Sequence, residues 1–367
     1  MTLREHDVLF VTRKFPPVLG GMENLSAEYA RSLEIAGNPK VIALRRSQRN
    51  LVWFLPIAAL RSLFALFVER ISTVLVGDAL MLVALWPVLM LRRVRVVVIV
   101  HGLDLTFPHW WYRALVRRAL RRADVVVPNS QATARVARTL GVDPARIEIV
   151  LPGLPVPSLG AIDRAGARAT VVRAARLVTD DVIIATLGRL VPRKGQAWFA
   201  AEVLPKLPAR FVYVVGGTGP NHAAVREAAD RAGVGDRCVL LGAVEDSLRE
   251  ALLVGADVFV VPNVEIPGDM EGFGIVAAEA ALRGTPVVAA RLEGLLDAVV
   301  DGELSVTCAP SDSPAFVTAI TGLVDREVGS DVREAAAETA AARLGNARFD
   351  REVAGVVRTK LAGGSAL

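Results

Sequence analysis

The stretch that decides the fold runs from Val94 to Gly102 and reads VRVVVIVHG. Its β-branched residues favour a strand. Apolar side chains occupy both faces of that strand, as in a parallel sheet covered by helices on both sides. His101 and Gly102 stand at its carboxyl end. Because ligands of open parallel sheets bind beyond the carboxyl ends of the strands, the loops after the strands are the predicted binding sites.

The same strand-then-helix pattern recurs along most of the 367 residues. It predicts an α/β protein of two domains, each with a parallel sheet covered by helices on both faces. The first predicted domain covers residues 1–158 and the second covers 159–345. A final helix is predicted in 346–367. The expected strands are His6–Thr12, Lys40–Leu44, Thr73–Gly77, Val94–Val100, Asp124–Pro128, Ile147–Leu151, Val182–Leu187, Phe211–Val215, Cys238–Leu241, Val258–Val261 and Pro286–Ala289.

The composition indicates the cellular compartment of the protein and the kind of surface that it binds. Two cysteines, Cys238 and Cys308, are too few for a disulfide framework or a zinc site, which predicts a cytoplasmic protein. Residues 1–160 hold 21 Lys and Arg against 11 Asp and Glu, whereas the remainder holds 22 against 27. This asymmetry predicts that only the first domain meets an anionic surface. No nucleic-acid module is visible, so the inner face of the cell membrane is the expected surface and the protein is expected to bind it peripherally.

Two apolar stretches in the first domain require comparison with membrane spans. Leu51–Val68 contains Arg61 and Pro56, and Ala79–Leu91 is shorter than the roughly 20 residues that cross a bilayer. We expect both to form buried or interfacial helices.

The strongest chemical signal is Glu271–Glu279, EGFGIVAAE. Glu271 lies in a loop with two glycines, and a helix is expected to begin near Gly274, where its free N–H groups would meet a phosphate. Glu279 follows one turn into that helix. Two carboxylates could thus bind hydroxyl groups on either side of a diphosphate. The alternative is a capped amphipathic helix with an exposed glutamate.

Other loops after strands add candidates. GRLVPRKG brings Arg189 and Lys194 to the end of a strand, where both could meet a diphosphate, or could form a solvated charged turn. His101 is expected to face the cleft, with a structural histidine bonded to backbone as the alternative. The glycines of three further loops allow close approach of backbone to a ligand, or a plain tight turn: Gly20, Gly21, Gly188 and Gly217.

These residues together resemble the family 4 glycosyltransferases. Glu271 and Glu279 form the E-x7-E pattern of that family, and GRLVPRKG, His101-Gly102 and ALRGTPVVAA are supporting matches. PPVLGG, RLVPRKG and GDMEGFGIV are most similar to the branch with phosphatidylinositol-mannoside mannosyltransferases. Two segments depart from the family pattern: the usual glycine pair and Pro-Glu become RLEGLLD at Arg291–Asp297, and the usual TGLLV-like segment becomes SVTCAP.

The resemblance implies a GT-B fold, in which two Rossmann-like domains have parallel sheets that face a deep cleft. Residues 1–158 would then form the acceptor-side domain and 159–345 the nucleotide-sugar-binding domain, and the helix in 346–367 would cross back to the first domain.

The resemblance also implies a role for each matching residue. Arg189 and Lys194 would bind the diphosphate of a UDP- or GDP-sugar, and Glu279 would hold the ribose. Glu271 would hold the transferred sugar, and His101 would contact it. Gly20 and Gly21 would approach the phosphates, and no metal or other cofactor would be needed. The backbone amides of Phe273, Gly274 and Ile275 would hold the transferred sugar together with Glu271. Gly188 and Gly217 are further candidates for donor binding.

The implied activity is retaining transfer of a mannose- or glucose-type hexose to a lipid-linked or glycan acceptor. Two alternatives remain, a GT-B sugar-nucleotide epimerase and a non-catalytic sugar-nucleotide-binding scaffold at the membrane.

Trp110–Arg122 holds five arginines and no acid, and on a helix the arginines share one half while apolar residues share the other. That pattern is typical of a helix lying in a membrane interface, or of a surface helix packed on a sheet. The predicted membrane or acceptor side is formed by Trp111, Arg117, Arg118, Arg121 and Arg122.

Overall fold

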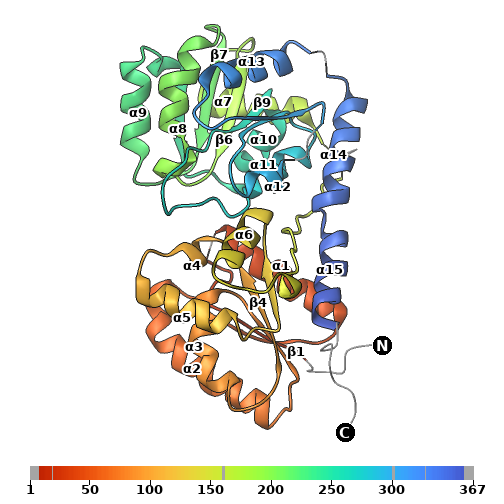
Figure 1. The fold of residues 1–367 in the computed structure, drawn as a ribbon. Helices are drawn as coiled ribbons and strands as arrows, with labels where there is room; N and C mark the ends of the chain where they lie inside the picture. The colour runs from red at the N-terminus through yellow and green to blue at the C-terminus, as the bar shows by residue number, and fades with distance from the viewer. Residues whose placement is uncertain (1–7, 19, 159–161, 300–301, 327, 359–367) are drawn as a thin grey trace. The chain divides into compact units, whose positions relative to one another are not determined.

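The computed structural model describes residues 8–18, 20–158, 162–299, 302–326 and 328–358. Contacts between Cα atoms divide the chain into two units. One holds the chain up to Leu154 and again from Leu344, and the other is Pro155–Arg343. Each unit is a parallel sheet with helices on both faces (Figure 1). The sequence placed the boundary after residue 158, whereas the contacts place it after Leu154.

The sheet of the first unit has five strands in the order β2-β1-β3-β4-β5, all parallel. Each strand begins and ends close to the predicted bounds, and β1, β3, β4 and β5 are buried throughout. The strands are β1 Val8–Thr12, β2 Lys40–Ala43, β3 Thr73–Val76, β4 Arg95–Val100 and β5 Val125–Pro128. The longer helices are α1 Gly21–Ala36, α2 Leu51–Phe67, α3 Ala79–Leu89, α5 Trp110–Leu120, α6 Gln131–Thr139 and α15 Asn346–Arg358, and α4 is the single turn Leu103–Thr106.

The C-terminal helix α15 packs on the first unit beside α1 (Figure 1). Phe349 is fully buried and meets the ring of Tyr29 edge-on at 4.8 Å between centroids. Arg31 donates to both carboxylate oxygens of Asp350 at 3.1 and 2.7 Å. The buried Arg95 donates to the carbonyl of Val357 at 3.0 Å. These contacts explain why a segment so far along the chain belongs to the first unit.

The sheet of the second unit has six parallel strands in the order β11-β10-β9-β6-β7-β8. Five of them were predicted, and the edge strand β11 was not. The strands are β6 Val182–Leu187, β7 Phe211–Gly216, β8 Cys238–Gly242, β9 Val258–Val261, β10 Val287–Ala290 and β11 Ser305–Cys308. The helices are α7 Arg164–Ala175, α8 Gln196–Trp198, α9 His222–Arg231, α10 Asp246–Gly255, α11 Ile275–Ala281, α12 Leu295–Ala298, α13 Ser313–Val324 and α14 Ser330–Leu344.

The predicted strand at Ile147–Leu151 is wrong in the first unit. Only an isolated bridge pairs Ile147 with Val126, although Glu148 and Val150 donate to carbonyls of β5. Pro128, in β5, has no N–H to donate in return, so the ladder cannot continue. This segment extends beside the sheet without joining it.

The two apolar stretches form helices in the first unit, and they differ in burial. α3 packs into the core through Met81, Leu82 and Leu85. α2 buries only Ala58, Ser62, Ala65 and Leu66. By length and composition alone, Gln48–Phe67 could cross a membrane, and 22% of its most apolar window is buried. The opposite face of α2 is exposed and apolar, which excludes the prediction of a buried helix for this segment.

Candidate functional site

In the second unit, a backbone hydrogen bond joins the loops that follow β6 and β7. Leu190 donates to the carbonyl of Thr218 at 2.9 Å. Gly188 and Gly217 have φ angles of 147° and 136°, which L side chains rarely adopt. A Cβ on Gly217 would fall 1.9 Å from the Gly188 carbonyl oxygen. Close packing of the two loops therefore requires Gly217, and the backbone angle requires Gly188. Their approach to a donor remains a prediction.

The carboxylate of Glu271 is the centre of a charged cluster at this edge. It lies 9% exposed after β9 and forms ion pairs with Lys194 and Arg193. Asn263 donates to it at 2.9 Å, and Arg193 also reaches Asp269 at 3.0 Å. Burial raises the pKa of Glu271, but Lys194 and Arg193 outweigh it and lower that pKa to about 2. Glu271 is thus a buried carboxylate that stays charged.

The cation beside Lys194 is not the one expected from the sequence. Arg189 was paired with Lys194 as a diphosphate ligand, yet its side chain is exposed. Within the described residues, the ion pairs of Glu271 are with Arg193 and Lys194. Pro192–Lys194 forms a single 3-10 turn, which presents Arg193 and Lys194 together. Arg193 belongs to the same GRLVPRKG stretch. The sequence therefore shows that cations gather in this loop, but it does not show which of them points toward Glu271.

The loop from Glu271 leads directly into α11, whose first helical residue is Ile275. Gly274 precedes it with φ 87°, and a Cβ there would lie 2.3 Å from a methyl group of Leu295. Phe273 is buried, so it can offer a ligand only its backbone. The predicted start near Gly274 is confirmed by this boundary. The amide of Ala277 donates to the carbonyl of Gly274 at 3.0 Å, whereas those of Ile275 and Val276 come too early in the helix to have a partner within it.

Glu279 lies one turn into α11 and forms an ion pair with Arg249 of α10. This partner was not identified from the sequence, because nothing in the spacing of α10 and α11 indicates that they meet. The ion pair with Arg249 fixes the orientation of the Glu279 carboxylate. Its assigned contact with a ribose remains a prediction.

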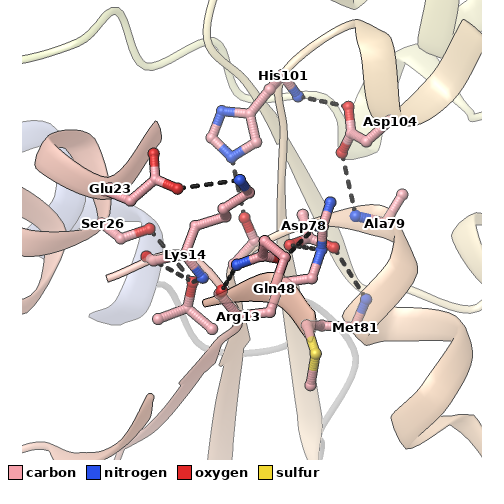
Figure 2. A network of polar contacts seen from close by, with 12 residues as sticks. Arg13, Lys14, Glu23, Ser26, Gln48, Asp78, Ala79, Met81, His101 and Asp104 are labelled. Carbon is pink, nitrogen blue, oxygen red and sulfur yellow. Dashed lines mark hydrogen bonds and ion pairs between the residues drawn. The ribbon is translucent and has the colours of Figure 1, made fainter. Parts of the chain in front are cut away.

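In the first unit, a second polar network lies at the carboxyl ends of β1, β3 and β4 (Figure 2). The side-chain Nε2 of His101 lies 2.9 Å from the carbonyl oxygen of Gly77. Since a carbonyl only accepts, Nε2 is the donor of this hydrogen bond and carries a proton. His101 is therefore buried and bonded to backbone, as in the structural alternative. That bond also fixes the tautomer that a sugar hydroxyl would need.

Asp104 holds the backbone of His101, and Asp78 fixes the loop that follows β3 (Figure 2). Asp104 accepts from the backbone N–H of His101 at 2.9 Å and of Ala79 at 3.1 Å, and burial raises its pKa. Asp78 is fully buried, accepts from the N–H of Met81 at 3.0 Å and lies 2.9 Å from Nε of Arg13. The ends of β3 and β4 are thereby joined at His101.

The same network holds a cation from the loop after β1. Lys14 lies 3.0 Å from a carboxylate oxygen of Glu23 in α1 (Figure 2). A Cβ on Gly20 would fall 2.3 Å from that carboxylate, and Gly21 is the first residue of α1. Lys14 and Arg13 were missed at the sequence level, although a charged pair directly after a buried strand is the signal that would have found them.

The predicted interfacial helix is α5, and its two faces are covered differently. This apolar face cannot lie in lipid, and that part of the prediction is wrong, because four of its side chains are buried in the core of the first unit, where α5 packs beside α3: Tyr112, Val116, Ala119 and Leu120. Leu115 is the exception, at 46% exposed. The basic face is exposed as predicted, together with Trp111. It borders a shallow hollow lined by Trp110, Arg113, Ala114, Arg117, Arg118, Arg121, Arg122 and Leu140.

Comparisons with known proteins identify the family. A sequence profile described as Glycosyltransferase Family 4 matches residues 1–156, and one described as Glycosyl transferases group 1 matches 181–326. A GDP-mannose-dependent alpha-(1-6)-phosphatidylinositol monomannoside mannosyltransferase of Mycolicibacterium smegmatis is 30% identical over 368 residues, with 92% of each chain covered. The chain belongs to the family 4 glycosyltransferases.

Other relatives of this family 4 glycosyltransferase are matched over less of their length. D-inositol 3-phosphate glycosyltransferase 2 of Catenulispora acidiphila is 33% identical over 217 residues, which is 55% of this chain and 48% of that protein. The chain thus spans about half the length of that relative. Among solved structures, Anabaena HepE in complex with UDP has a TM-score of 0.76 at 18% identity, with 95% and 98% of the chains covered. Sucrose-phosphate synthase of Thermosynechococcus elongatus has 0.74 at 18%, with 96% and 98% covered. These likenesses confirm the GT-B fold.

Proposed function

We propose that this family 4 glycosyltransferase moves a mannose- or glucose-type hexose from a GDP- or UDP-sugar to a lipid-linked or glycan acceptor, with retention at the anomeric carbon and without a metal. The observation that carries the proposal is the Glu271 cluster. A carboxylate kept charged beside Lys194 and Arg193 combines an acceptor for sugar hydroxyls with two cations for a diphosphate. This combination suits a nucleotide-diphosphate sugar.

The chemistry follows from the charges that develop as the donor breaks. The acceptor oxygen bonds to the anomeric carbon while the bond from that carbon to the diphosphate breaks. Negative charge grows on the leaving diphosphate, and Lys194, with Arg189 or Arg193, would stabilise it. A phosphate oxygen of the leaving group takes the proton of the acceptor hydroxyl. The new bond forms on the face that the diphosphate leaves, so the configuration is retained.

In the structure, Glu271 forms ion pairs with both Lys194 and Arg193. A diphosphate would compete for these two cations, and Glu271 would then be released to accept from sugar hydroxyls. His101 would accept from another hydroxyl through Nδ1. His101→Ala should therefore lower transfer without weakening binding of free UDP or GDP.

The test of the proposal is a donor and acceptor screen. GDP-mannose and UDP-glucose are supplied with phosphatidylinositol monomannoside in vesicles or with inositol 3-phosphate, the acceptors suggested by the names of the two relatives. We expect one donor to release nucleotide only when an acceptor is present. Release or epimerisation of the sugar without acceptor would favour the epimerase, and binding without any turnover would favour the scaffold.

We also propose that the first unit binds the inner face of the membrane peripherally. Two exposed surfaces support this proposal. The basic face of α5 would be attracted to anionic lipid, at about 1 kcal/mol for each basic residue near the surface. The apolar face of α2 can enter the headgroup region in place of the buried face of α5: Trp53 is 74% exposed, Leu60 67% and Phe64 53%.

Sedimentation with vesicles of anionic lipid tests this contact. We expect wild-type protein to sediment at low salt and less at high salt, because screening weakens the basic contribution. Replacing Arg117, Arg118, Arg121 and Arg122 by Ser should remove the salt-sensitive part, whereas Trp53→Ser with Leu60→Ser should weaken the part that remains at high salt. Neither variant should change donor binding. Wild-type protein that stays in the supernatant at low salt would exclude the membrane proposal.

A further inference from the structure

Glu293 has an unusual backbone for its residue type. It lies between β10 and α12 in the segment where the family resemblance leads one to expect a glycine pair, and its φ is 48°. A non-glycine residue seldom adopts this left-handed conformation, and strained residues of this kind persist where the surrounding structure over-determines them, often at functional sites. The side chain is half-buried. A glycine would avoid this strain, so the presence of a glutamate at this position requires an explanation.

The explanation lies in the contacts with Glu271. The backbone N–H of Glu271 donates to the Glu293 carboxylate, and the N–H of Gly294 donates to the Glu271 carbonyl at 3.1 Å. A Cβ on Gly294 would fall 2.1 Å from the carbonyl oxygen of Gly272. The next residue, Leu295, fills the space beside Gly274. Three consecutive residues of one loop thus lock the backbone from Glu271 to Gly274 on both sides.

We propose that Glu293 is a positioning residue, which fixes the backbone of Glu271 so that the Glu271 carboxylate is aimed at the donor sugar. This inference rests on the proposed function for its role in transfer, and on the contacts alone for the fixing of the backbone. The side chain of Glu271 is held by Lys194, Arg193 and Asn263, and the two cations exchange partners when a donor binds. The backbone contacts keep Glu271 in place during that exchange.

Placing the Glu293 carboxylate beside that of Glu271 costs stability, because the two like charges repel each other. That cost indicates that Glu293 has a function. Burial raises the pKa of Glu293, and the neighbouring Glu271 raises it further against the hydrogen bond from the Glu271 N–H. A second carboxylate beside Glu271 therefore repels it. A purely structural loop would dispense with both the repulsion and the left-handed backbone by using glycine.

Three substitutions separate the carboxylate from the backbone strain. Glu293→Gln keeps an oxygen that accepts from the Glu271 N–H. Glu293→Ala removes the acceptor and keeps the strain, whereas Glu293→Gly removes both. Arg176→Gly is the matched control, because Arg176 is an exposed residue of similar φ, 56°, at the end of α7. That control should leave transfer and Glu271 unchanged.

The first measurement needs no substrate. Hydrogen exchange of the Glu271 amide in the ligand-free protein should be at least about tenfold faster in Glu293→Ala and Glu293→Gly than in wild type, and close to wild type in Glu293→Gln, because a hydrogen-bonded amide must open before it exchanges. Glu293→Ala should also unfold at a lower temperature than Glu293→Gly. Unchanged exchange in both Ala and Gly variants would overturn the inference, even if no donor were ever turned over.

The second measurement uses whichever of GDP-mannose and UDP-glucose the wild type turns over. Glu293→Ala and Glu293→Gly should lose about tenfold in kcat/KM, the scale of one lost hydrogen bond. Their affinities for free GDP and UDP should be unchanged. Glu293→Gln should retain activity within about threefold. A Gln variant as impaired as the Ala variant would overturn positioning, since the charge of Glu293 or a direct sugar contact would then be responsible. Wild type inactive with every donor would instead count against the proposed function.

Discussion

Replacing Glu271 by Gln should make the free energy of unfolding fall less steeply as the pH is lowered below neutral. The pKa of this carboxyl falls from its ordinary value of 4.5 to about 2 in the folded protein, because Lys194 and Arg193 outweigh the effect of burial. A group with a depressed pKa contributes stability above its unfolded pKa and loses it as the pH falls through the folded value. The full contribution is about 3 kcal/mol, at 1.36 kcal/mol for each pKa unit. About 1.4 kcal/mol of it should be lost between pH 7 and pH 3.5.

The assay is urea unfolding of both proteins, followed by circular dichroism at pH 7 and pH 3.5. The loss of unfolding free energy over that interval should be larger for wild type than for Glu271→Gln by about 1.4 kcal/mol. All other titrating groups are shared, so the difference reports Glu271 together with its effect on the pKa of Glu293. Equal losses in the two proteins would refute the conclusion that this carboxylate is held as an ion by Lys194 and Arg193.

Three further predictions concern transfer, nucleotide binding and the fold. Lys194→Ala should lower turnover by roughly 10²–10³-fold and Arg189→Ala by a similar factor if it too stabilises the leaving diphosphate; turnover within threefold of wild type for either variant in a kinetic assay would remove that residue from the site. Glu279→Ala should weaken binding of free UDP or GDP in calorimetry, whereas Glu271→Ala should not, and equal losses would contradict this division of roles. Phe349→Ala should lower the unfolding free energy by about 3–5 kcal/mol in urea titrations, because it empties a fully buried site between α15 and α1; a loss under 1 kcal/mol would show that α15 is not part of the core.

Strands were the most predictable part of the fold. A run such as VRVVVIV predicts β4 because both of its faces are buried, and the structure confirms it. The edge strand β11 escaped prediction because SVTC is half polar and only Cys308 is buried. Burial on both faces gives a sequence signal that an edge strand lacks.

The candidate site could be located from the sequence but not assembled in detail. The E-x7-E pattern located Glu271 and Glu279, yet their ion-pair partners Arg193 and Arg249 depend on side-chain directions and on which helices meet. Glu293 was visible only as a departure from a family pattern. Its role depends on a left-handed backbone and on contact with a loop more than twenty residues away.

The surface of the first unit shows another limit of sequence patterns. The two faces of α5 were assigned correctly by helical periodicity. An apolar face packed on a sheet and one packed in lipid have the same periodicity, so the pattern cannot say which medium covers it. The structure assigns the apolar face of α5 to the core and leaves the apolar face of α2 exposed instead.

The most direct test of the central claim is the configuration of the transferred sugar, followed by proton NMR while the reaction runs. Wild-type protein is supplied with an α-linked donor such as GDP-mannose and an acceptor in vesicles. The account predicts that an α-linked product forms, with nucleotide diphosphate released in equal amount and only when acceptor is present. A β-linked product, or loss of donor without any acceptor, would contradict it.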